Sequence, residues 1–217
     1  RRKHRDNKGL SDPMRIELHG TTINHRIVDQ VVDVLKNGGL IIYPTDTVYG
    51  LGCDITQKAA IERIYRVKGM EKQKPLSFVC SDIKDISKYA KISTVNYRDL
   101  RKHLPGPYTF ILPGTREVPK SLLSKQKTVG VRIPDHPLTL AIVEALGNPI
   151  ISTSVNISAK SFASDPQEFS EYYEGQVDLI LDSGPTWAEL SSVIDMTDDD
   201  QPIVIRKGQG DVSWCLT

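Results

Sequence analysis

A dense group of polar side chains directly follows an early apolar run in this chain. Residues 40–42 are Leu, Ile and Ile, and residues 43–52 read YPTDTVYGLG, which places Thr45, Asp46 and Thr47 together. Connections at strand ends often bind ligands, because a rigid scaffold holds them within reach of water. Two hydroxyls and a carboxyl group are more than a plain surface turn requires. We therefore interpret residues 43–52 as a ligand-binding turn at a strand end.

Three further stretches carry cations, hydroxyls or amides beside a predicted strand. They are the cationic loop 68–76, the strand and turn 128–137, and the hydroxyl-rich stretch 152–158. Lys is a compact charge that neutralises phosphate oxygens, and Arg can hold a carboxylate or phosphate through two hydrogen bonds. The ordinary alternatives are a solvated loop for 68–76 and a turn that bonds its own backbone for 152–158.

The third stretch has a pattern suited to anion binding. Ser152, Ser154 and Asn156 stand at alternate positions and would share one face of an extended segment. Such hydroxyl and amide groups can donate to phosphate or carboxylate oxygens. Arg132, at the end of a predicted strand, suits the same anions. We interpret His136 as a turn or helix-cap residue rather than a base.

Several other chemistries lack their motifs in this sequence. It has no Ser-His-Asp arrangement and no G-x-S-x-G, and its other His residues have no zinc-ligand spacing. It also lacks the G-x-G-x-x-G and G-x-x-x-x-G-K-[ST] phosphate cradles, and the lone G-x-G at 208–210 indicates a turn. The remaining hydroxyls, amides and cations suit the alignment and neutralisation of an anionic reacting group, as in nucleotidyl transfer.

These groups must be positioned by helices and strands that mix along the whole chain. Apolar residues recur at helical spacing from Asn24, a candidate cap, to Leu35, and Asp165 before Pro166 predicts another helix start. This mixture predicts a single α/β domain around a twisted, mixed open sheet at 14–217, after a disordered basic arm at 1–13. The predicted helices cover 24–35, 59–67, 95–102 and 137–146 and begin at 81 and 165, and the predicted strands cover 15–18, 40–43, 76–80, 108–112, 128–133, 149–152, 177–181, 192–195 and 203–206.

The composition limits the class of protein. The chain has 217 residues, a formal net charge of +1 and three widely spaced Cys, which fits a reducing compartment. No apolar run approaches the roughly 18 residues of a membrane span. We expect a cytoplasmic monomer that does not contact membranes. The alternative location is an organelle, mitochondrion or plastid, after removal of a targeting segment.

Together these motifs resemble the threonylcarbamoyl-AMP synthase superfamily, the YrdC/YciO group, from about Gly38 to Gly210. The resemblance rests on several motifs in the same order along the chain. They are YPTDTVYGLG at 43–52, PGPYTFIL at 105–112, VGVRIP at 129–134, STSVN at 152–156, SVID at 192–195 and VIRKG at 204–208.

The resemblance implies a YrdC-like fold, an α/β twisted open sheet with a large, concave, positively charged cleft. It implies a nucleotidyltransferase that condenses L-threonine, bicarbonate and ATP, with Mg²⁺, into threonylcarbamoyl-AMP and pyrophosphate for tRNA threonylcarbamoyladenosine modification. The implied catalytic residues are Lys68, which would neutralise the triphosphate, and Ser154 and Asn156, which would align the α-phosphate. The resemblance also implies threonine contacts from Thr47 and Arg132, with Ser152 and Ser191 nearby, a nucleotide and phosphate site lined by Lys68, Thr128, Ser154, Asn156 and Arg206, and no metal ligand from the protein.

Three positions depart from the pattern of the synthases. Met70 stands where they carry an Arg, Lys74 where they carry an Asn, and Val79 where they often carry a His. Loss of a charged bidentate contact costs about 1.5–3 kcal/mol, or roughly tenfold or more in binding. Lys72 or Lys74 could compensate as point charges, without the geometry of a guanidinium. With PGPYTFIL and the late GQGD at 208–211, the chain is closer to the YciO branch.

The departures leave two functions open. The first is the synthase reaction. The alternative is an RNA-binding, YciO-type protein that has lost the synthase step, with tRNA or double-stranded RNA as its partner. The basic arm and the Lys120, Lys125 and Lys127 stretch favour RNA, whereas the near-neutral net charge and the lack of interleaved aromatics count against it.

Overall fold

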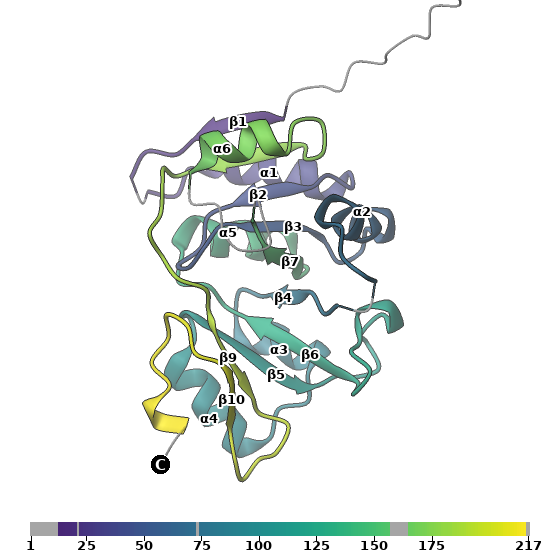
Figure 1. Cartoon of the computed structure of the whole chain (residues 1–217), viewed down its shortest axis with the longest axis vertical. Coiled ribbons are helices and arrows are strands. Elements are labelled where there is room, and N and C mark those ends of the chain that lie inside the picture. The colour runs from purple at the N-terminus through teal and green to yellow at the C-terminus, as the bar shows by residue number, and fades with distance from the viewer. Residues whose placement is uncertain (1–12, 21, 73, 157–164, 216–217) are drawn as a thin grey trace, which may run out of the picture.

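One mixed sheet of ten strands organises the protein (Figure 1). The computed structural model describes residues 13–20, 22–72, 74–156 and 165–215. Along the sheet the strands follow the order β1-β8-β2-β3-β7-β4-β6-β5-β9-β10. Their bounds are β1 (Met14–Glu17), β2 (Ile41–Tyr43), β3 (Gly50–Asp54), β4 (Ser77–Val79), β5 (Tyr108–Pro113), β6 (Thr128–Arg132), β7 (Ile150–Ser154), β8 (Leu179–Asp182), β9 (Ser192–Asp195) and β10 (Ile203–Arg206).

The helices cover the sheet with apolar faces. Val31 and Leu35 of α1 and Ile142 of α5 pack in one buried cluster with Ile41 and Tyr43 of β2. Successive strand side chains point to opposite faces, so the next residues along β2 and its neighbours join a second, larger cluster beneath the other helices. The helical bounds are α1 (His25–Lys36), α2 (Lys58–Lys68), α3 (Ile83–Tyr89), α4 (Thr94–His103), α5 (Pro137–Leu146) and α6 (Pro166–Tyr172), with short 3₁₀ turns η1 (Lys120–Leu122) and η2 (Ser213–Cys215).

Local sequence signals fix most helix starts. Asn24 caps α1, because its Oδ1 accepts from the backbone N–H groups of Arg26 and Ile27 at 3.0 and 3.4 Å. Asp165 caps α6, with Pro166 in its first turn. The prediction of a mixed α/β sheet is confirmed, and every predicted helix and strand appears within a few residues of its predicted bounds.

One strand escaped prediction. β3 pairs antiparallel with β2 and with β7, so the polar segment at 43–52 ends inside the sheet and only its middle is a turn. Glycines weaken an isolated strand, and Gly50 and Gly52 supply no side chain to the usual alternating pattern. Pairing on both sides makes this segment a strand.

Two expectations concern the ends and the surroundings of the domain. The basic arm predicted at 1–13 lies, apart from Pro13, outside the described residues. Within the part of the chain that the structure describes, none of the helices has the length and apolar character needed to cross a bilayer.

Candidate functional site

A cavity of about 290 Å³ opens in the middle of the sheet, beside the turn after β2. Its walls include residues of β7, β4, β6, β5, β9 and β10, which are neighbours in that order along the sheet. Its walls come from segments far apart in the sequence. The structure brings six of the predicted site residues to its lining: Thr128, Arg132, Ser152, Ser154, Ser191 and Arg206.

Arg132 is the buried cation of this cavity. β6 ends at this residue, and its Nη2 donates to Asp46 Oδ1 at 2.7 Å while its Nη1 donates to Thr47 Oγ1 at 3.1 Å. Only 8% of Arg132 is exposed. Among the described residues, Arg132 Nε and Asp46 Oδ2 are buried without a hydrogen-bond partner. Buried polar groups are normally satisfied, so Arg132 Nε is a spare donor suited to an acceptor such as a carboxylate, and Asp46 Oδ2 is a spare acceptor suited to a donor such as an amine.

The turn that carries Asp46 is built by hydroxyl groups. Thr45 Oγ1 accepts from the Thr47 N–H at 3.0 Å and donates to the Val48 carbonyl oxygen at 2.9 Å. Thr47 borders a second cavity of about 170 Å³ behind this turn, and it reaches the main cavity through Arg132. The predicted role of Thr47 in substrate contact thus depends on its bond to Arg132.

Ser152 is held by a buried tyrosine. Tyr43 Oη donates to Ser152 Oγ at 2.6 Å, and burial raises the pKa of Tyr43 to about 12. Ser152 and Ser154 both line the cavity, and so does Thr153 between them, so their alternate spacing alone does not account for the lining. Asn156 does not join that lining. It lies on Lys68.

Lys68, at the end of α2, is absent from the cavity lining and contacts the end of β7 beside it. Its Nζ donates to the Ser154 carbonyl oxygen at 2.8 Å and to Asn156 Oδ1. No carboxylate of the described chain lies within ion-pair distance of it. Burial lowers the pKa of Lys68 to about 8. A half-buried ammonium with only neutral neighbours suits an anionic ligand.

The opposite side of the site carries Arg206 and Ser191. Arg206 Nε and Nη2 donate to the Ser191 carbonyl oxygen at 3.0 and 2.9 Å. Ser191 Oγ also shares a 2.8 Å hydrogen bond with Thr109 Oγ1. Burial first, and then the positive charge of Arg132, lower the pKa of Arg206. Arg132 and Arg206 both line the cavity, so an anion bound there would meet positive charge from both residues.

The structure also adds residues that the sequence analysis missed. Ser124 lines the cavity, and its Oγ shares a 2.7 Å hydrogen bond with Thr128 Oγ1. Thr109 and Tyr43 lie inside recognised motifs, so the motifs could have suggested them, whereas nothing in the sequence marks Ser124. His136 caps α5 by accepting from the Thr139 N–H at 3.3 Å, which confirms its interpretation as a cap.

The three departures from the synthase pattern occupy different environments. Met70 packs against the larger apolar cluster and is absent from the cavity lining. Lys74 is exposed on the loop before β4. Val79 lines the cavity and is buried, so it presents an apolar surface to a ligand.

Known proteins are similar in sequence to this chain over most of its length. The sequence model of the Sua5/YciO/YrdC family, described as telomere recombination, matches residues 17–208. The YciO protein of Escherichia coli K12, named as uncharacterized, is 42% identical over 197 residues, or 90% of this chain and 95% of that protein. The threonylcarbamoyl-AMP synthase of Vibrio vulnificus YJ016 is 31% identical over 157 residues, or 71% of this chain and 84% of that protein.

Solved structures agree with this relationship. E. coli YciO matches with a TM-score of 0.87 and 40% identity, covering 94% of this chain and 99% of that one. The Sua5 protein of P. abyssi, in complex with L-threonine, matches with a TM-score of 0.82 and 29% identity, covering 91% of this chain and 58% of that one. On sequence and structure alike, this chain belongs to the Sua5/YciO/YrdC family.

Proposed function

We propose that this protein is a threonylcarbamoyl-AMP synthase, which condenses L-threonine, bicarbonate and ATP into threonylcarbamoyl-AMP and pyrophosphate for tRNA modification. The observation that carries the proposal is the cationic cavity. Arg132 is buried there with an unused Nε donor, Arg206 also lines the cavity, and Lys68 bonds to Ser154 of the lining. Neither Arg206 nor Lys68 has a carboxylate partner among the described residues. A family relative that bears the synthase name and another solved with L-threonine support the proposal.

The amino-acid half of the site would be the Arg132 side of the cavity. Arg132, oriented by its bond to Thr47, would hold the carboxylate of threonine, with Ser152 and Ser191 close to its amine and hydroxyl. The threonine amine and bicarbonate would form a carbamate with loss of water. A carbamate oxygen would then attack the α-phosphorus of ATP, forming a P–O bond as the bond to pyrophosphate breaks.

The nucleotide half would be the side formed by Lys68, Ser154 and Thr128. Lys68 and Arg206 would neutralise the triphosphate, and Ser154 and Asn156 would align the α-phosphate for attack. Holding both reactants in one cavity converts a bimolecular step into an effectively intramolecular one. Fixed cations also stabilise charge that develops on the leaving pyrophosphate.

Mg²⁺ would enter this site as part of the nucleotide substrate. Within the described residues, no group of three or more His, Cys, Asp or Glu side chains is placed to hold a metal ion. Asp46 is paired with Arg132 instead. The donors at the cavity are hydroxyls and cations, which fit phosphate oxygens better than a metal, so the phosphates would supply the oxygen ligands of Mg²⁺.

The deciding experiment is pyrophosphate release by the purified protein with ATP and Mg²⁺, with and without L-threonine and bicarbonate. Release that requires both co-substrates is expected. Lys68→Ala should abolish most of it, while Lys58→Ala, at the exposed start of α2, should not. Absence of pyrophosphate release despite ATP binding would overturn the proposed synthase activity. Wild-type release by Lys68→Ala would overturn the proposed role of Lys68.

One observation favours RNA binding as a second candidate function. Lys120 of η1 is exposed, as are Lys125 and Lys127 on the connection from η1 to β6. Ser124 of that connection and Thr128, the first residue of β6, line the cavity. A phosphate backbone bound there would release counterions, so its affinity must fall steeply with salt. Affinity of a labelled RNA duplex that is independent of salt, or unaffected by Lys125→Gln with Lys127→Gln, would exclude this role.

A further inference from the structure

The turn at 208–210 connects two segments from distant parts of the chain. Gln209 Nε2 donates to the Asp46 carbonyl oxygen at 2.8 Å, across 163 residues of sequence. Gln209 Oε1 accepts from the Glu189 N–H at 3.2 Å, and the Gln209 N–H donates to the Leu190 carbonyl oxygen at 2.8 Å. Gln209 therefore ties the Asp46 turn to residues 183–191, which we call the strap.

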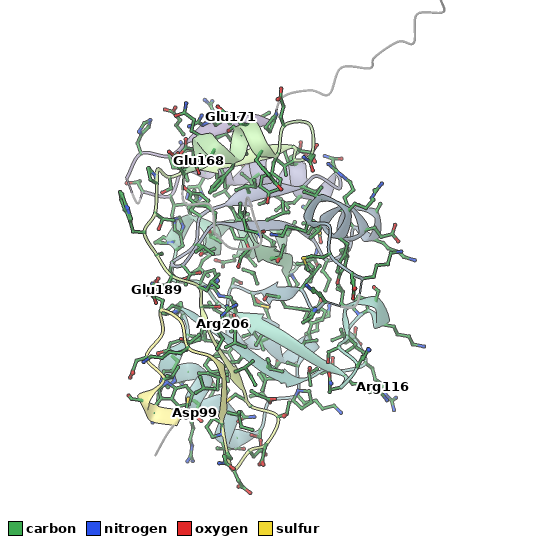
Figure 2. The ribbon with its side chains drawn as sticks, viewed as in Figure 1. Asp99, Arg116, Glu168, Glu171, Glu189 and Arg206 are labelled. Atoms are coloured by element: carbon green, nitrogen blue, oxygen red, sulfur yellow. The ribbon has the colours of Figure 1, made fainter. Side chains whose placement is uncertain are left out.

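The strap runs along one edge of the molecule between β8 and β9 (Figure 1). Tyr49 holds its beginning, because the Tyr49 hydroxyl donates to the Gly184 carbonyl oxygen at 2.7 Å. Gln209 holds its end. Figure 2 labels Glu189 of the strap and Arg206, the last residue of β10, which precedes Gln209 by three positions.

The backbone on either side of Gln209 is held by hydrogen bonds to Ser192 and by close packing at Gly208 and Gly210. Ser192 is fully buried, and its Oγ accepts from the Gly208 N–H at 2.9 Å and donates to the Gly210 carbonyl oxygen at 2.6 Å. A Cβ at Gly208 would lie 2.3 Å from the Leu190 carbonyl oxygen, and one at Gly210 would lie 2.5 Å from the Tyr108 ring. Only glycines fit at these two positions, so the Gln209 side chain starts from a defined place.

The position of the Asp46 turn matters because Arg132 bonds to Asp46 and Thr47 and is also the proposed contact of a substrate carboxylate. A substrate carboxylate on Arg132 would share the guanidinium with Asp46 Oδ1 and Thr47 Oγ1, which already accept from Nη2 and Nη1. The bond from Gln209 goes to the backbone oxygen of Asp46 and does not involve its carboxylate. This bond is therefore independent of what Arg132 binds.

We propose that Gln209 is a positioning residue that holds the Asp46 turn in place while a substrate carboxylate engages Arg132. The inference rests on the proposed function, because it takes that carboxylate to belong to the amino-acid substrate. Thr139 also holds the turn, through a 2.7 Å bond to the Pro44 carbonyl oxygen, but this bond is buried in the core. Gln209 is exposed, so its side chain can be changed with little effect on packing.

Three variants test this role. Gln209→Met keeps the length of the side chain and removes both side-chain bonds. Gln209→Glu keeps an acceptor for the Glu189 N–H but removes the donor to Asp46. Gln201→Met, on the exposed connection between β9 and β10, is the matched control.

The first measurement is hydrogen exchange of the backbone amides of residues 45–49, which needs no catalytic activity. Both Gln209 variants should exchange about two- to tenfold faster than wild type, the range expected for one lost hydrogen bond, and Gln201→Met should not. Unchanged exchange in Gln209→Met would overturn the inference. So would wild-type exchange in Gln209→Glu, because the bond to Asp46 would then be unnecessary.

The second measurement separates a positioning role from a merely structural one. The KM for L-threonine should rise by a similar factor, about two- to tenfold, while the KM for ATP stays unchanged. Faster exchange with an unchanged KM for threonine would overturn the positioning role. A wild-type protein without synthase activity would overturn the proposed function, and hydrogen exchange would still decide whether Gln209 holds the turn.

Discussion

The ammonium of Lys68, at the end of α2, donates to the Ser154 carbonyl oxygen, at the end of β7, over 2.8 Å. These residues lie 86 positions apart in the sequence. The contact places a cation beside Ser154, a residue of the cavity lining, with neutral oxygens around it. Burial lowers the pKa of Lys68 to about 8, so its charge changes with pH in a range where most lysines stay fully protonated.

ATP binding should weaken as the pH rises through about 8, the lowered pKa of Lys68. The neutral amine that forms above this pKa cannot neutralise phosphate. Lys68→Arg should remove this loss, because a guanidinium stays charged, and Lys58→Arg should behave as wild type. The measurement is the Kd for ATP across a pH series, since turnover also depends on deprotonation of the threonine amine. A Kd that does not change through this range in wild type would contradict the prediction.

Arg132→Gln should destabilise the fold by about 3–5 kcal/mol, because it leaves the Asp46 carboxylate buried without its cation. Asp46→Asn combined with Arg132→Gln should recover part of that free energy of unfolding, measured in urea. The double variant should still lack threonine-dependent pyrophosphate release. Recovery of both stability and activity would show that Arg132 serves only as the partner of Asp46.

Tyr43→Phe should lower the free energy of unfolding by about 1–2 kcal/mol, because the buried Ser152 hydroxyl loses its 2.6 Å partner. Urea unfolding measures this change, and Tyr97→Phe, at an exposed position on α4, is the control. The KM for L-threonine should also rise, since Ser152 would no longer be held at the cavity wall. An unchanged stability would indicate that Ser152 finds another partner.

Met70→Arg should lower the KM for ATP by about tenfold or more, if the guanidinium supplies the charged contact that the synthase pattern places there. Met14→Arg, on the edge strand β1, adds the same charge far along the sheet from the cavity and is the control. Steady-state kinetics at saturating threonine and bicarbonate would measure the effect. An unchanged KM for ATP in Met70→Arg would indicate that the exposed Lys72 and Lys74 already supply the charge, or that the nucleotide does not pass this loop.

Local physics made much of the architecture predictable from the sequence. Helix caps act over a few residues, so Asn24 and Asp165 predicted the starts of α1 and α6. The apolar run before Ser152 predicted the strand that carries Ser152 and Ser154, and both line the cavity together with Thr153. β3 could not be predicted in this way, because Gly50 and Gly52 form a strand only when paired with β2 and β7.

The sequence alone determined which chemical groups the protein has and, through the order of its motifs, the family to which it belongs. Only the tertiary structure decided which groups meet. Arg132 reaches Asp46 across 86 residues, Gln209 reaches the same turn across 163, and Met70 turns to the apolar cluster instead of the cavity. The physical reason is that sheet pairing is non-local: side-chain alternation fixes the face of a strand, whereas its neighbours depend on contacts between distant segments.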